Sequence, residues 1–465
     1  MQEPDFSGGD RANARVAKEV IKMYLFSKED LRKLIIPLIL EQILAVLVGL
    51  CDTVMVSHVG EAAVSGVSLV DMVNQLAITV FSALATGGAV IASQYLGHNN
   101  KKRACESANQ LLLVVTAISA TVMLLCIVAR GPILRLFFGK IESEVMYSAL
   151  VYFLISALSY PFLAIYNAGA AIFRSMNRSS VTLVISGLMN IVNIIFNSIF
   201  IFGFRMGVAG AAIGSLLARA FSAIVISLLL RNEKNEIHFV HFKKPLFEWG
   251  LAKKILYIGI PNGIENGIFQ LGRIIVVAII AGFGTTQIAA NAVANVFDGI
   301  GILPGNAYQL AMITVVGRCV GAGDYKQARY YTRKLVGQCY IILGTLNALL
   351  MLTLNLTLRL YALSPETILL AKQLIMIHCG AAIVLWPLSF VLPNTLRASN
   401  DVKFTMSISI CSMFVFRVLL SLVLAGHFGM GAIGVWLAMI VDWIFRTTLF
   451  VIRYRGDKWQ RIRLI

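Results

Sequence analysis

Charged side chains are scarce in this sequence. Of its 465 residues, 14% are charged and 58% are hydrophobic, whereas soluble proteins have about 25% charged and roughly 45–50% apolar residues. So few charges cannot cover the surface of a water-soluble globule, and so many apolar residues cannot all be buried inside one. The composition therefore excludes an ordinary soluble protein and predicts that lipid covers much of the surface.

Other missing features exclude further classes of protein. The seven cysteines are odd in number and contain no C-x-x-C pair, so we expect neither a disulfide framework nor a zinc site. The first twenty residues lack an apolar segment, so we expect no cleaved signal peptide. No G-x-x-x-x-G-K-[ST], G-x-S-x-G or H-E-x-x-H motif occurs. Direct use of ATP and hydrolase activity therefore have no support, and we expect neither an enzyme nor a cofactor.

What the sequence does contain is long apolar runs. A helix needs about 20 apolar residues to cross the hydrocarbon core of a membrane. Twelve runs qualify, near residues 34–58, 66–94, 108–130, 147–170, 181–203, 208–230, 252–280, 288–317, 335–357, 366–394, 404–425 and 431–452. Because they lack the alternation of β-barrel strands, they predict an all-α integral membrane protein with twelve transmembrane helices.

Lysine and arginine are divided unevenly between the two sides of these runs. Thirty of the 40 lie on the side that holds both ends of the chain, five lie in the opposite loops and five lie inside the runs. The positive-inside rule therefore predicts a multi-pass protein of the cell membrane with both termini in the cytoplasm. Because the cations lie between apolar runs, the net charge of +17 reflects topology, and we expect no nucleic-acid partner.

The chain contains two copies of one unit. IPLILEQ at 36–42 aligns with IPNGIEN at 260–266, and YLGHNNKKRA at 95–104 aligns with CVGAGDYKQA at 319–328 at the same offset. Each copy has six spans, so the predicted fold is two six-helix lobes related by a pseudo-two-fold axis along the membrane normal. The expected units are a cytoplasmic segment 1–33, an N-lobe 34–230, a linker 231–250, a C-lobe 251–453 and a cytoplasmic tail 454–465.

Two acidic residues share one face of the first span. Glu41 and Asp52 are eleven residues apart, which places them roughly 20° apart around a helix and about 16 Å apart along it. An acid inside a membrane is costly, so this face must look into the bundle or a water-filled cavity. Both residues are therefore candidates for function.

Polar residues on two later spans could meet Asp52. Asn190, Asn193 and Asn197 recur at spacings of three and four in the fifth span, and Ser215 lies early in the sixth. A carboxylate, amide oxygens and a hydroxyl suit a small hard cation such as Na⁺, and a desolvated carboxylate could instead carry a proton. The alternative is that the asparagines only hold helices together. We favour a cation site.

The second half has charged residues inside its spans as well. Glu265 is the repeat partner of Glu41, Arg273 lies eight residues further on, and Asp298 lies in the eighth span. We expect these residues and Glu41 to line a substrate cavity whose charges are mainly acidic, with Arg273 able to neutralise Glu265 across the cleft.

For three more polar residues inside spans, a structural explanation is sufficient and no function is expected. Asp442 precedes Arg446 by four residues, so the two are expected to pair on one helix. Asp71 is expected to be wet, and His378 is expected to be a satisfied core histidine.

Four segments in combination resemble the multidrug and toxic compound extrusion (MATE) transporters. These segments are VGLCDTVMVSHVG (48–60), QYLGHNNKKRA (94–104), RCVGAGDYKQA (318–328) and NIVNIIFNSIFIFGFRMGVAGAAIGS (190–215). The resemblance implies a V-shaped pair of lobes that exports cationic or amphipathic organic compounds against an inward flow of H⁺ or Na⁺. It also implies a coupling site in the N-lobe at Asp52, Asn193, Asn197 and Ser215.

One departure from the family pattern bears on the coupling ion. Members of this type commonly have a second acid where Asn197 stands, and its loss favours H⁺ over Na⁺. The expected partners are organic cations and the lipid bilayer, and the expected state is a monomer. Two alternatives remain open: a flippase for lipid-linked oligosaccharides, which would need a strongly cationic cleft, and an exporter of a metabolite rather than of drugs.

Overall fold

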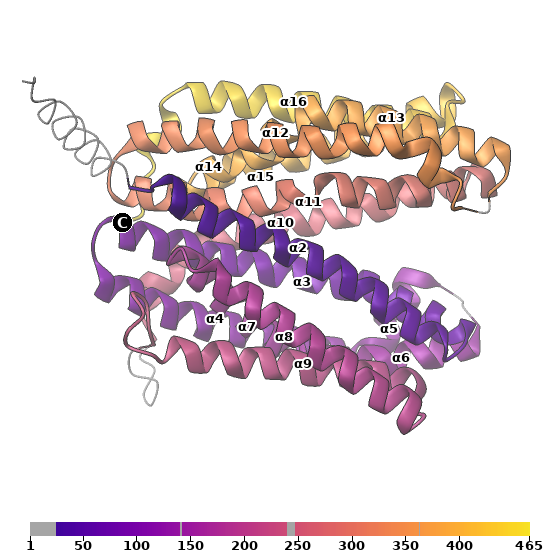
Figure 1. Ribbon diagram of the computed structural model, residues 1–465, viewed down its shortest axis with the longest axis horizontal. Helices are drawn as coiled ribbons and strands as arrows, with labels where there is room; N and C mark the ends of the chain where they lie inside the picture. Colours follow the sequence, from indigo (N-terminus) through magenta and orange to yellow (C-terminus); the bar gives the residue numbers. More distant parts are fainter. Residues whose placement is uncertain (1–24, 140–141, 240–246, 362) are drawn as a thin grey trace, which may run out of the picture.

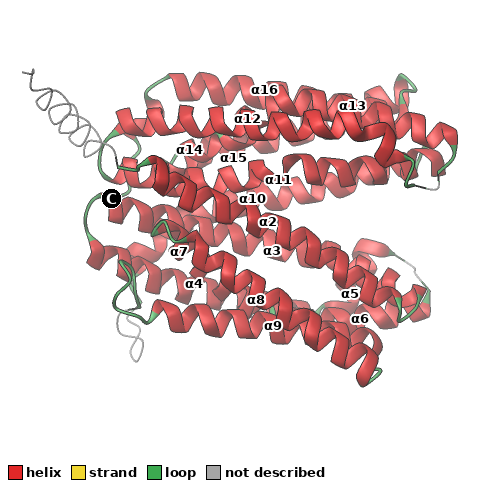
Figure 2. Cartoon of the chain, in the orientation of Figure 1, coloured by secondary structure: helices red, strands yellow, loops and turns green. Residues whose placement is uncertain are grey.

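The computed structural model describes residues 25–139, 142–239, 247–361 and 363–465. Throughout these residues the regular structure is helical, with no strand (Figure 2). Some cations counted for topology, among them Lys140, Lys243 and those before residue 25, lie outside the described residues.

The first repeat forms one bundle and the second repeat forms another (Figure 1). The first comprises α2 (Lys28–Ser57), α3 (Glu61–Gly97), α4 (Lys101–Val128), α5 (Arg130–Phe138), α6 (Ser143–Leu158), α7 (Tyr160–Ser175), α8 (Ser179–Ser198), η1 (Ile199–Gly203) and α9 (Gly207–Leu230). The second comprises α10 (Trp249–Ala281), α11 (Thr285–Gly321), α12 (Tyr325–Leu358), α13 (Pro365–Trp386), η2 (Pro387–Val391), α14 (Pro393–Ala398), α15 (Val402–Ser412), η3 (Met413–Leu419), η4 (Leu422–His427) and α16 (Gly431–Arg455), followed by the short η5 (Lys458–Arg461).

The twelve predicted spans are confirmed, with one of them broken. Within the described ranges, eleven helices are long and apolar enough to cross a membrane, and α6 with α7 forms a twelfth span bent by 46°. The bend falls at Ser159, just before Pro161 in the first turn of α7. A proline has no backbone N–H to continue the helical hydrogen bonds of α6, which explains the break.

Side chains form hydrogen bonds with backbone groups at the start of the first span and beside its proline. Ser27 and Asp30 form the expected capping box at the start of α2. Pro37 lies inside α2 and cannot donate to the carbonyl of Lys33. The Ser179 hydroxyl of α8 lies 2.7 Å from the carbonyl oxygen of Leu34 and 3.3 Å from that of Lys33. Helix α8 therefore satisfies part of the backbone that proline leaves open.

The two bundles meet at the end of the molecule that holds Lys28 and Arg455, which we name the terminal end. Their ribbons diverge toward the opposite end (Figure 1). Helix α3 of the first bundle packs against α10 and α11 of the second, and α2 also packs against α11. The divergence makes the V shape that the family resemblance implies.

Two repeat-related glycines allow this close contact. A Cβ on Gly97 would lie 2.0 Å from the carbonyl oxygen of Arg318, and a Cβ on Gly321 would lie 1.9 Å from that of Gln94. Both distances are impossible for a real side chain, so only glycine permits α3 and α11 to cross here. The Gln94 amide donates across the bundles to the Ala398 carbonyl at 2.8 Å. The repeated YLGH and CVGA motifs thus form one reciprocal helix crossing.

Candidate functional site

The structure joins the polar residues predicted on three spans of the N-lobe. Asn197 Nδ2 donates to Asp52 Oδ1 at 2.9 Å and lies 3.2 Å from Asn193 Oδ1, and Asn193 Nδ2 donates to Ser215 Oγ at 3.1 Å. The chain of contacts runs from α2 through α8 to α9. Asn193 is 6% exposed and Asn197 is 1% exposed. We name these four residues the Asp52 chain.

Spacing and a glycine explain how the Asp52 chain assembles. Asn193 and Asn197 are one helical turn apart on α8, so their side chains share a face. A Cβ on Gly214 would lie 2.0 Å from Asn197 Oδ1, so the glycine before Ser215 leaves room for the amide. Asn190 is buried on the same helix, but its Nδ2 has no hydrogen-bond partner among the described residues. Asn190 is therefore not part of the Asp52 chain.

Two charged residues that were not expected in the cation site lie beside Asp52. Asp71 on α3 and Arg219 on α9 are close enough to interact electrostatically with it. Asn74 Nδ2 donates to Asp71 Oδ1 at 3.2 Å, and Arg219 Nη1 donates to Ser159 Oγ at 2.6 Å. Asp71 has a large exposed fraction, and its carboxylate also interacts with the Tyr152 side chain. The signal that could have found this group was an acid and an arginine in spans of the same lobe.

Glu41 lies on the same helix nearer the terminal end and has its own partners. Its carboxylate lies 3.6 Å from Arg174 Nη1 and accepts a hydrogen bond from the Thr182 hydroxyl at 2.9 Å. The side chains of Glu41 and Arg174 are 12% and 13% exposed. The negative charge of Glu41 is thus neutralised by a neighbouring helix rather than left free.

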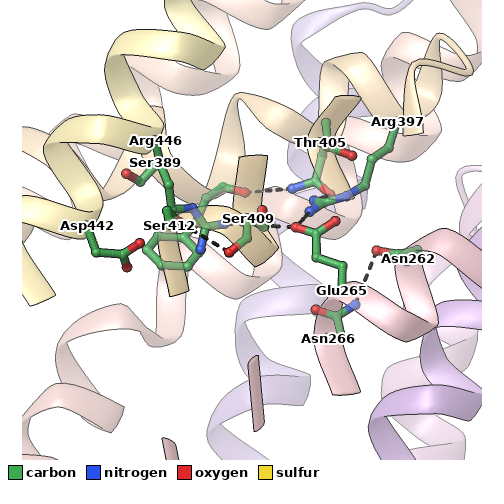
Figure 3. A network of polar contacts seen from close by, with 12 residues as sticks. Asn262, Glu265, Asn266, Ser389, Arg397, Thr405, Ser409, Ser412, Asp442 and Arg446 are labelled. Carbon is green, nitrogen blue, oxygen red and sulfur yellow. Dashed lines mark hydrogen bonds and ion pairs between the residues drawn. The ribbon is translucent and has the colours of Figure 1, made fainter. Parts of the chain in front are cut away.

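Glu265 is also neutralised, and this corrects the expected pairing with Arg273. Its carboxylate lies 2.5 Å from Arg397 Nη2 and 4.0 Å from Arg446 Nη2, and the residue is 4% exposed. Figure 3 shows Glu265 and Arg397 facing one another. Arg397 was counted among the flanking cations, but it is buried in α14.

Asp442 and Arg446 do not form the expected pair along α16. Arg417 Nη1 lies 3.8 Å from Asp442 Oδ2, whereas Arg446 reaches Glu265 and lies over the Phe390 ring at 4.5 Å. The prediction failed because tertiary neighbours on α10 and η3 supply ionic partners that spacing on one helix cannot reveal.

A cavity of about 440 Å³ lies against these residues in the C-lobe and reaches α3 of the N-lobe. Its charged lining consists of four arginines and two acids, namely Arg273, Arg397, Arg417, Arg446, Glu265 and Asp298. Glu265, Arg273 and Asp298 line this cavity, whereas Glu41, which was expected beside them, does not. The expectation of a mainly acidic lining was wrong, because Arg397, Arg417 and Arg446 also line the cavity and were not expected there.

Asp298 meets His378 at the wall of this cavity. Asp298 Oδ1 lies 3.1 Å from His378 Nε2. His378 is 1% exposed and lies edge-on to the rings of Trp436 and Trp443. Its surroundings are those of a core histidine, but neither ring nitrogen has a hydrogen-bond partner among the described residues, so the expectation that it is satisfied was wrong. Within the described residues, no group of three or more His, Cys, Asp or Glu side chains could hold a metal ion.

Twelve spans in two pseudo-symmetric bundles, with charged residues inside each bundle, define a two-lobed membrane transporter. The MatE family model matches residues 37–199 and 261–423, one match in each bundle. The chain therefore belongs to the MatE family of transporters. The family resemblance, the all-α fold and the two-lobed arrangement expected from the sequence are confirmed.

Relatives of similar length support the same assignment. The chain is 26% identical over 445 residues to the "Probable multidrug resistance protein NorM" of Thermotoga maritima, with 93% of each chain covered. It is 27% identical over 431 residues to the "Uncharacterized transporter YisQ" of Bacillus subtilis, with 91% of this chain and 93% of that one covered.

Solved structures share the fold at low sequence identity. A MOP superfamily transporter from Pyrococcus furiosus has a TM-score of 0.86 at 18% identity, covering 94% of this chain and 97% of that one. A multidrug resistance MATE family transporter described in an outward-facing conformation has a TM-score of 0.85 at 19% identity, with the same coverage.

Proposed function

We propose that this chain is a secondary active antiporter of the cell membrane that exports small organic molecules in exchange for an inward-moving cation. The observation that carries the proposal is the Asp52 chain, in which one carboxylate connects α2 to α8 and α9. A cation can drive export only if it binds one conformation better than another. Neutralising Asp52 changes its contact with Asn197, so it biases how α2 packs against the rest of its lobe.

The composition of the Asp52 chain favours H⁺ over Na⁺. An amide N–H of Asn197 donates to the Asp52 carboxylate at 2.9 Å. Asp52 is also the only charged residue of the four, and Asn197 stands where related transporters commonly have a second acid. A proton needs a single carboxylate, and Asp52 supplies it.

The sidedness of the proposal follows from the charges. The terminal end is proposed to be cytoplasmic, with the lobes closed there and diverging toward the outside. This is the state in which Asp52, farther from the terminal end than Glu41, can receive a cation from outside. The protein is proposed to act as a monomer surrounded by lipid and to need no cofactor.

The residues on which a cationic substrate was expected no longer support that expectation. Glu41 and Glu265 both contact arginine, so neither presents a free negative charge. Four arginines in the C-lobe cavity favour a second candidate function, a flippase or metabolite exporter whose substrate has an anionic head. Both candidates use the same alternating access.

Reconstitution tests the proposed exchange. Purified protein in liposomes is given an inward proton gradient, an inward Na⁺ gradient or neither, and efflux of a panel of cationic, neutral and anionic organic compounds is measured. We expect efflux with the proton gradient alone. Efflux that needs Na⁺ and ignores pH would overturn the choice of ion, and efflux that is equal under all three conditions would overturn antiport.

A further inference from the structure

We propose that the C-lobe cavity binds an organic anion, with a carboxylate or phosphate head held by arginine and an apolar body packed against aromatic rings. The inference rests on the proposed function in one respect, because it takes this anion to be the exported substrate. It depends on the four arginines and two acids that line the cavity, together with Asp442, which pairs with one of the arginines.

The positive charges outnumber the negative charges that could pair with them. Arg397 and Arg446 share Glu265, and Arg417 is paired with Asp442 at 3.8 Å. Asp298 lies 3.1 Å from His378 and also interacts electrostatically with Arg417. Arg273 takes part in none of the ion pairs of the described residues, and it interacts electrostatically with Arg417, which has the same sign of charge. Like charges inside a membrane protein are costly unless something neutralises them.

Several buried N–H groups of these arginines have no acceptor. Arg446 is 2% exposed and Arg397 is 6% exposed. Among the described residues, Arg446 Nε and Nη1, Arg397 Nε and Arg417 Nε lack a hydrogen-bond partner. Glu265 Oε2 and both carboxylate oxygens of Asp442 also lack a partner among the described residues, but a guanidinium has five donors and no acceptor, so the arginine N–H groups outnumber these oxygens and a ligand can supply further acceptors. A carboxylate or phosphate provides several acceptor oxygens and the missing negative charge.

Aromatic side chains form the remaining wall. Trp386 stacks on Phe390 with ring centroids 5.1 Å apart, and Phe390 meets Trp443 edge-on at 5.9 Å. All three line the cavity. Its volume of about 440 Å³ falls within the roughly 300–1,000 Å³ typical of sites for drug-sized molecules. Rings beside arginines select a ligand that has both an apolar body and an anionic head.

Three probes of matched size separate charge from shape. Equilibrium dialysis measures how the purified full chain, in phosphatidylcholine nanodiscs and without any gradient, binds 2-naphthoate, neutral 2-naphthamide and cationic 2-naphthylmethylammonium. We expect 2-naphthoate to bind at least about tenfold more tightly than the other two, since a hydrogen bond to a charged group contributes about 1.5–3 kcal/mol. Equal binding of all three probes, or a preference for the cation, would overturn the proposal.

Variants assign the preference to the cavity. Arg273→Gln should weaken 2-naphthoate binding about tenfold and leave 2-naphthamide binding unchanged, and Arg417→Lys should weaken it less than Arg417→Gln. Arg359→Gln removes the same charge from an exposed position in the C-lobe outside the cavity and should change neither. Arg273 has no ion pair to lose, so Arg273→Gln is expected to fold. Unchanged 2-naphthoate binding by Arg273→Gln and Arg417→Gln would overturn the site.

The source of the anion and the proposed export are tested separately. Phosphatidylglycerol in the nanodiscs will displace 2-naphthoate if the natural head belongs to a lipid and will leave binding intact if it belongs to a water-soluble anion; either result supports the anion site. Binding without gradient-driven efflux of 2-naphthoate would contradict the proposed function and leave the site standing. Efflux of other compounds by a protein that does not bind 2-naphthoate would contradict the anion site and leave the proposed function standing.

Discussion

At the scale of single residues, Glu265 illustrates how ion pairs stabilise a charge that is buried inside a membrane protein. It is 4% exposed and contacts Arg397 and Arg446. Attraction within such a pair offsets the cost of removing both charges from water, so removing one partner leaves the other buried and uncompensated. The acid is therefore important for stability, whatever part it has in transport.

We predict that Glu265→Gln destabilises the protein by about 3–5 kcal/mol. Glu41→Gln should cost less, because the pair with Arg174 is longer at 3.6 Å and both side chains are more exposed. Thermal unfolding in detergent measures both variants against Glu61→Gln, an exposed acid whose change should stay within about 0.5 kcal/mol. A Glu265→Gln protein as stable as Glu61→Gln would show that the ion pairs are unimportant for stability.

The sequence predicted the residues of the Asp52 chain but not the partners of the C-lobe charges. Asn193 and Asn197 could be found because helical periodicity places them on one face. Arg397 could not, because it lies beside a loop in sequence and is buried only once α14 packs against α11. Asp442 was misassigned for the same reason, since helical spacing reveals neighbours on one helix and not those on another.

At the scale of elements, the crossing of α3 and α11 closes the terminal end. Gly97 and Gly321 allow the two backbones to approach, and any side chain there would meet a carbonyl oxygen. The contact is easily broken by a methyl group, because the obstacle is backbone rather than the flexible end of a side chain. The repeat alignment paired these glycines from the sequence, but not their reciprocal contact.

We predict that Gly97→Ala and Gly321→Ala open the terminal end. Spin labels on Lys102 and Lys326, both exposed, should show a longer distance by pulsed electron paramagnetic resonance than in the otherwise unmodified protein. Gly337→Ala, in α12 with nothing within 4 Å of the added Cβ, is the matched control and should leave the distance unchanged. An unchanged distance in the Gly97 and Gly321 variants would contradict a closing role for the crossing.

The π-helical segments of the fold could not be predicted from the apolar runs that predicted the helices. The apolar runs predicted twelve spans, but four segments within them, η1, η2, η3 and η4, are π-helical. The segment η3 contains Arg417, which faces the cavity. Such turns are frequent at functional sites, and here one of them positions a charge.

At the scale of the whole molecule, the distribution of cations predicts the orientation of the membrane protein. Cysteines placed at Glu61 and His427, near the end opposite the terminal end, should react with an impermeant reagent from outside intact cells. A cysteine at Asn232, in the linker that joins the two lobes along the sequence, should react only after the membrane is permeabilised. Reaction of Asn232→Cys in intact cells would overturn the proposed topology.

The central claim is that one carboxylate, Asp52, couples cation entry to export. Its most direct test is Asp52→Asn in liposomes, compared with wild type and with Glu61→Gln, measuring both efflux driven by a proton gradient and substrate binding without a gradient. Asparagine imitates the neutral state, so we predict that gradient-driven efflux falls to the level of empty liposomes while substrate binding persists. Full proton-driven efflux by Asp52→Asn would contradict the claim.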